Sequence, residues 1–190
     1  LSRDHHIFDH EKDGAENLFS IVGGKLASYR IMSQEVTDII CQRLGNRNSC
    51  ETHCKPLPGG SPYDSSFAPY LELGLSEHTA SRIQSRHGER SERILENMRK
   101  SPRSRALVCP ISPVTEAELR YVIREEMVGD LDDVRRRCHL SRNGIGGMDP
   151  LYRAAQIFCE EKGMHPDQAQ EMAINVANIS WRERLPVQSR

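Results

Sequence analysis

Residues 115–140 read TEAELRYVIREEMVGDLDDVRRRCHL, and this stretch decides the fold of the C-terminal part of the chain. Thr115 is followed three residues later by Glu118, which is the pattern of a capping box at a helix N-terminus. The apolar residues after it recur at helical spacing and predict one buried stripe. Asp130 predicts the cap of a second helix after a break at Gly129. The residues of the stripe are Leu119, Val122, Ile123 and Met127.

The same signals recur on both sides, so we expect everything from Ser76 onward to be helical. Ser76 is the expected cap of a helix that stops near Gly88. Asp149-Pro150 opens another helix, and Pro166 sits at the first position of a last helix that runs to about Trp181. Apolar positions expected on these helices include Ala80, Ile83, Ile94, Leu95, Met98, Tyr152, Ala155, Ile157 and Phe158.

The N-terminal residues have a different pattern. Residues 1–22 are typical of two strands joined by a turn at Asp13-Gly14. From Leu26 to Leu44 apolar residues recur at spacings of three and four, which predicts an amphipathic helix. Residues 45–70 contain four prolines and three glycines and are expected to form a linker or a long ordered loop. The fold class predicted is α+β: a hairpin and helix in 1–44, then the linker, then an all-helical domain in 71–190.

Composition excludes several classes of protein. No apolar run approaches the ~20 residues that a membrane-spanning helix needs. With 26 Lys and Arg against 27 Asp and Glu, the net charge of −1 gives no general attraction to nucleic acid. Six scattered cysteines without a signal peptide indicate reduced thiols in the cytoplasm. The start at Leu1 rather than Met suggests a fragment.

The stretch SIVGGKLASYR (20–30) is the strongest candidate site. Gly23 and Gly24 permit a positive φ or a close approach to a ligand. A helix beginning after them offers unpaired N–H groups, and Lys25 adds a full positive charge. These features favour a site for an anion, or for negative charge developing on a ring oxygen. The alternative is a tight strand-to-helix turn with an exposed lysine.

Two other stretches carry polar groups of interest. Arg3 could lie near the glycines if the strands pair, and arginine suits a phosphate or carboxylate. From the residues alone, however, a surface arginine is favoured. The stretch HHIFDH (5–10) contains zinc-ligand types. On a strand, however, His6 and His10 face one side while His5 and Asp9 face the other. We therefore predict no metal site.

Several of these motifs resemble one family. SRDHHIFDH (2–10) and LFSIVGGKLASYR (18–30) are similar to the end of the catalytic domain of FAD-dependent glycerol-3-phosphate dehydrogenases. Residues 115–140 resemble the helical C-terminal domain of the same family. The stretch LPGG (57–60) and the closing SWRERLPV (180–187) look most like the anaerobic-type catalytic subunit.

The resemblance implies roles for particular residues. Lys25 would lie beside the pyrimidine edge of the flavin and stabilise negative charge on the reduced ring. Arg3 would bind the substrate phosphate. The implied reaction is hydride transfer from C2 of sn-glycerol 3-phosphate to N5 of FAD, giving dihydroxyacetone phosphate. The residues implied to line the flavin edge, with Lys25, are Gly23, Gly24, Leu26 and Ala27.

The chain departs from that family in two ways. The glycine-rich dinucleotide fingerprint is missing, so the 190 residues alone are not expected to hold FAD or turn over. Anaerobic-type members also carry a two-iron two-sulfur cluster on four cysteines. Cys109 matches the first ligand, but Ile111, Ile145 and Pro150 occupy the other positions. We therefore predict no iron-sulfur cluster. Residues 105–163 would then keep the helix-turn-helix scaffold of that cluster domain in an empty form. Replacement ligands at Cys138 and Cys159 are disfavoured because both fall in predicted helices.

We therefore expect part of a cytoplasmic flavin-dependent dehydrogenase. Peripheral association with the inner face of the cell membrane, a homodimer and a partner subunit stay open. One alternative is a non-catalytic helical module that binds a partner subunit, suggested by the abundant helix and the lost cysteines. The other is a metal or iron-sulfur module.

Overall fold

The computed structural model describes residues 4–109, 111–140 and 148–188, with side chains described as far as Arg182. It divides into two compact units, residues 1–57 and 58–190, and each is considered by itself. No helix in the described ranges has the length and apolar character needed to cross a bilayer. In chain order the elements are β1 (His5–Asp9), η1 (His10–Asp13), β2 (Phe19–Gly23), η2 (Leu26–Ser28), α1 (Tyr29–Arg43), α2 (Ala68–Leu71), α3 (Glu77–His87), η3 (Gly88–Arg90), α4 (Ser91–Lys100), η4 (Pro102–Arg105), β3 (Leu107–Cys109), β4 (Val114–Thr115), α5 (Glu116–Glu125), α6 (Leu131–Cys138), α7 (Asp149–Lys162) and α8 (Gln168–Gln188).

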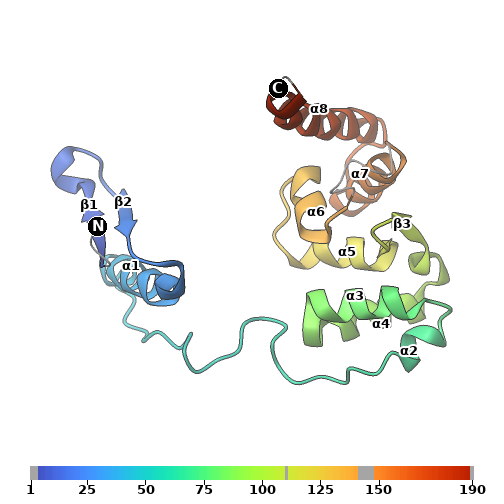
Figure 1. The fold of residues 1–190 in the computed structure, drawn as a ribbon, viewed down its shortest axis with the longest axis horizontal. Coiled ribbons are helices and arrows are strands. Elements are labelled where there is room, and N and C mark those ends of the chain that lie inside the picture. The colour runs from blue at the N-terminus through green and yellow to red at the C-terminus, as the bar shows by residue number, and fades with distance from the viewer. Residues whose placement is uncertain (1–3, 110, 141–147, 189–190) are drawn as a thin grey trace. The chain divides into compact units, whose positions relative to one another are not determined.

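The N-terminal unit is the predicted hairpin followed by the predicted helix (Figure 1). Strands β1 and β2 pair antiparallel, with His5 opposite Gly23 and Asp9 opposite Phe19. The reversal predicted at Asp13-Gly14 is confirmed, since Gly14 closes the turn in the left-handed conformation. Among residues 4–57, none is buried, so this unit has no core of its own.

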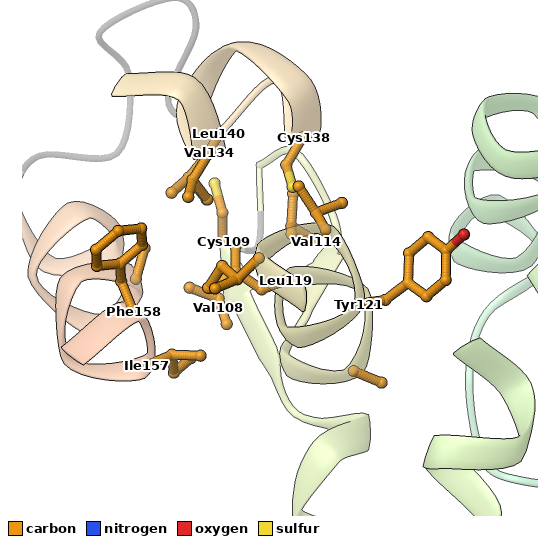
Figure 2. Close-up of a cluster of buried hydrophobic side chains, with 14 of the residues drawn as sticks. Val108, Cys109, Val114, Leu119, Tyr121, Val134, Cys138, Leu140, Ile157 and Phe158 are labelled. Carbon is orange, nitrogen blue, oxygen red and sulfur yellow. The ribbon is translucent and has the colours of Figure 1, made fainter. Parts of the chain in front are cut away.

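The C-terminal unit has a continuous hydrophobic core. Helix α5 packs against α4, α6 and α7, and α8 packs against α6 and α7 (Figure 1). Figure 2 shows that this core brings Leu119 of α5 together with side chains from α6, α7 and the short strands, among them Val134, Phe158 and Cys109. The predicted α+β class with a helical C-terminal region is confirmed.

The predicted caps explain where these helices begin. Ser76, Thr115 and Asp130 each accept a hydrogen bond from the backbone N–H three residues later, and α3, α5 and α6 start directly after them. The second half of the capping box does not form as expected. The carboxylate of Glu118 instead contacts α3, where Arg82 and His87 lie close to it.

Several sequence predictions in this unit were wrong in detail. Strands β3 and β4 form a small antiparallel hairpin in a region expected to be wholly helical. Met127 is not part of the buried stripe: α5 ends at Glu125, Met127 has a φ of 48° and is 92% exposed, and Val128 turns inward in its place. Tyr152 lies half-exposed on α7, because Leu151, Ala154 and Ala155 are the residues of this turn that face the core. The last helix also continues past Trp181 to Gln188.

The segment that enters the C-terminal unit is held against α3. The carbonyl of Gly59 accepts a hydrogen bond from the N–H of Glu89 at 3.1 Å. The side chain of Gln84 donates to the carbonyl of Ser66 at 3.1 Å, and the Tyr63 hydroxyl lies 3.4 Å from the carbonyl of Gln84. Part of the stretch expected to be a linker or a long ordered loop is therefore ordered structure on the helical unit.

Candidate functional site

The paired-glycine corner joins β2 to η2. Gly23 and Gly24 have φ values of 91° and 76°, in the left-handed region that strongly favours glycine. A Cβ on Gly23 would lie 2.6 Å from the carbonyl oxygen of Asp4, and a Cβ on Gly24 would lie 2.7 Å from the sulfur of Met32. The positive φ therefore favours glycine at both positions, and the backbone of Asp4 leaves no room for a Cβ at Gly23. The space beside their α-carbons is filled by Asp4 and Met32.

Lys25 follows this corner directly and is exposed. Its ammonium has no ion-pair partner within the residues that the structure describes. Beyond it, the N–H groups of Leu26 and Ala27 lie in the first turn of η2, where a helix has no acceptor of its own. Among the described residues, the corner therefore presents a positive charge without an ion-pair partner beside the N–H groups of a helix start, an arrangement that can stabilise an anion.

Arg3 lies outside the described residues. Its chain neighbour Asp4 accepts a hydrogen bond from the N–H of Gly24 at 3.2 Å. The described end of the first strand therefore meets the glycine corner directly.

The histidines of the first strand take separate partners. His5 pairs with Glu35 of α1 at 2.8 Å, and His10 lies 2.9 Å from both Asp13 and Ser20. Asp9 pairs instead with Arg43. Across the described ranges, no three His, Cys, Asp or Glu side chains gather as metal ligands do.

A buried charged cluster in the C-terminal unit was missed by the sequence reasoning. Glu118 is fully buried and ion-pairs with Arg82. His87 lies between two carboxylates: its Nε2 is 3.1 Å from Glu118 and its Nδ1 is 3.6 Å from Glu126. Only a doubly protonated imidazole presents an N–H group to both carboxylates. Arg82 and Arg86 lie one helical turn apart on α3, and this basic face was a signal in the sequence for a partner carboxylate.

The two carboxylates decide the charge of the histidine. Burial by itself disfavours the imidazolium, but the hydrogen bonds and negative charges of Glu118 and Glu126 outweigh it and raise the pKa of His87. The hydrogen bond from His87 in turn lowers the pKa of Glu126.

This cluster predicts a pH dependence of stability. An unfolded histidine has a pKa of about 6.5, so the stabilisation from charged His87 is complete below that pH and is lost as the pH rises through the higher folded pKa. We expect the free energy of unfolding, measured with urea, to fall across that range. His87→Gln should abolish the fall, whereas the exposed control His165→Gln should keep it. A fall of equal size in His87→Gln would contradict this assignment.

Comparison with known proteins identifies the family. The family model for the C-terminal domain of alpha-glycerophosphate oxidase matches residues 50–173, which is more than half of the chain. The chain belongs to this family.

Individual relatives extend the similarity to the N-terminal unit. An anaerobic glycerol-3-phosphate dehydrogenase subunit of Haemophilus influenzae is 36% identical over 98% of this chain. The subunit of the same name from Escherichia coli K12 is 30% identical over 98%. A glycerol-3-phosphate dehydrogenase of Synechocystis is 30% identical over 72%. The chain spans about a third of the length of the first two relatives, 33% and 34%.

At the positions that the family resemblance assigns to iron-sulfur ligands, the residues of this chain do not offer the donors that a cluster needs. Cys109 is fully buried in the core, and its sulfur accepts a hydrogen bond from the N–H of Ser112. Ile111 is exposed and Pro150 lies in the first turn of α7, while Ile145 is outside the described residues. Since isoleucine and proline carry no thiolate, this residue set does not fit a cluster on four cysteines.

Proposed function

We propose that this chain is the C-terminal part of an FAD-dependent dehydrogenase that oxidises sn-glycerol 3-phosphate to dihydroxyacetone phosphate. The family and the names of the relatives support the reaction class. The single observation that carries the proposal on this chain is the exposed Lys25 at the glycine corner, which has no ion pair with any residue that the structure describes.

The residues at the corner fit a group that becomes negatively charged. FAD would supply the acceptor for the hydride that leaves C2 of the substrate. Lys25 would place its ammonium where negative charge develops on the reduced ring. The N–H groups of Leu26 and Ala27 would donate hydrogen bonds to the same negatively charged edge. Arg3 would bind the phosphate of the substrate. Gly23 and Gly24 would set the backbone path that carries Lys25 to this position.

The exposed apolar surface of the N-terminal unit supports the same proposal. Leu26 and Tyr29 are 90% and 66% exposed, and Val22 is 58% exposed, in a unit without a buried residue among those described. A unit of this size without a core is not stable alone. We propose that it packs on a larger flavin-binding domain, consistent with the greater length of the relatives.

Removing the charge of Lys25 tests the proposal. In the longer chain that the proposal requires, Lys25→Ala should slow flavin reduction by roughly 100-fold, because one donor to a developing negative charge is lost. Anaerobic stopped-flow absorbance at saturating sn-glycerol 3-phosphate measures this rate. Lys25→Arg keeps the charge and should retain most of it.

Lys12→Ala is the matched control, since Lys12 is an exposed lysine at the opposite end of the same hairpin. Its reduction rate should equal that of the unmodified protein. A Lys25→Ala protein that also reduces its flavin at the original rate would remove Lys25 from the site.

We propose that the helical unit binds no iron-sulfur cluster, because only Cys109 remains of the ligand set. Iron analysis and the visible spectrum of the purified chain, after anaerobic treatment with iron and sulfide, test this. Because two of the relatives are named as subunits of an enzyme, they also support a partner subunit. We propose a cytoplasmic location, with peripheral contact to the inner face of the cell membrane.

A further inference from the structure

We infer that Ser28, together with Met32 and Glu35, forms a positioning face on η2 and α1 that fixes the backbone from which Lys25 projects. This inference rests on the proposed function, because the role of the face is defined by the role of Lys25. None of the three side chains is placed in contact with substrate or cofactor. Each instead contacts the corner or the strand beside it.

The Ser28 side chain contacts both the backbone N–H and the backbone carbonyl of Lys25. The backbone N–H of Lys25 donates to the Ser28 hydroxyl at 3.2 Å, and that hydroxyl donates to the carbonyl of Lys25 at 2.8 Å. The N–H of Ser28 donates to the same carbonyl at 2.9 Å. One side chain therefore fixes the extended backbone of Lys25, which has φ −124° and ψ 156°.

Met32 contacts Gly24, and Glu35 contacts the start of β1. The Met32 sulfur occupies the space that a Cβ on Gly24 would need, and it lies 3.5 Å from the Ser28 hydroxyl. Glu35 pairs with His5 at 2.8 Å, which ties the start of β1 to α1. The β-carbon of His5 would in turn lie 3.4 Å from a Cβ on Gly24.

The sequence spacing of these residues places them on one side of the helix. Residues 28, 32 and 35 are separated by four and three positions, which aligns their side chains along one face. That face meets the end of the hairpin, so a single rigid element sets the position of both the corner and the strand that leads to it. This arrangement fixes the backbone position of Lys25, although its side chain is exposed.

The experiment compares two isosteric variants of Ser28 in the longer flavoprotein. Ser28→Thr keeps the hydroxyl, and Ser28→Val replaces it with a methyl group of the same shape. We expect Ser28→Val to slow flavin reduction about fivefold, the loss typical of one capping hydrogen bond. The KM for sn-glycerol 3-phosphate and the flavin content should not change, and Ser28→Thr should restore the rate. Ser33→Ala on the same helix is the control, because the Ser33 hydroxyl donates to the carbonyl of Tyr29, one turn earlier in its own helix.

A double-mutant cycle separates positioning from general support of the fold. If Ser28 acts through Lys25, Ser28→Val should cause no further loss in a Lys25→Ala background. Equal losses in both backgrounds would overturn the inference, as would an unchanged rate in Ser28→Val alone. A Lys25→Ala protein with the original rate would instead refute the assignment of Lys25 in the proposed function.

Discussion

Glu118→Gln is expected to lower the free energy of unfolding of the helical unit by about 3–5 kcal/mol, because it breaks a buried ion pair from one side. The carboxylate is fully buried and faces Arg82, while Arg86 lies 3.8 Å away and His87 3.1 Å away. The amide keeps the shape of the side chain but removes the negative charge that faces Arg82, Arg86 and His87. Urea unfolding followed by circular dichroism measures the change.

Glu125→Gln is the matched control on the same helix. Glu125 is half-exposed and pairs with Arg93 at 3.6 Å, so its contribution is that of a surface ion pair. We expect a change of less than about 1 kcal/mol. Equal effects of the two substitutions would show that the buried cluster does not stabilise the contact between α3 and α5.

The second large effect is expected at Gly88, where α3 ends against the entering segment. A Cβ at this position would overlap the backbone carbonyl oxygen of Gly59. The residue also has φ 55° and ψ −133°, a conformation that side chains rarely adopt. Gly88→Ala should therefore cost about 3 kcal/mol or more, combining backbone strain with a clash that only movement of the segment can relieve.

Gly163→Ala separates the two causes of that loss. Gly163 ends α7 with a φ of 66°, and nothing described lies within 4 Å of its added Cβ. Only the left-handed conformation is penalised there, at about 1 kcal/mol. Gly88→Ala should additionally speed chymotrypsin cleavage near Tyr63 and Phe67, because the segment is displaced from α3. Matching stability and cleavage rates in the two variants would disprove the close contact between Gly59 and Gly88.

The local elements were predictable because their signals are local. Ser76, Thr115 and Asp130 cap their helices through the N–H three residues later, and Gly14 closes a turn of its own hairpin. The prediction failed at Met127, where periodicity continued in the sequence after the backbone had left the helix. It also missed β3 and β4, which are too short to show an alternating pattern.

The candidate site divides in the same way. The pattern of Gly23, Gly24 and Lys25 in the sequence was enough to predict a positively charged corner. What occupies the space beside the glycines could not be read from that pattern, because Met32 reaches the corner only when α1 folds back on the hairpin. The Ser28 contacts follow from the same geometry.

The sequence by itself determined the capped helices, the hairpin and the charge presented at Lys25, since each depends on residues within a few positions of one another. Tertiary structure alone decided that Glu118 turns from its own helix cap to His87 and Arg82, and that Gly88 must be glycine. These outcomes join residues about 30 positions apart, and packing between separate elements sets them.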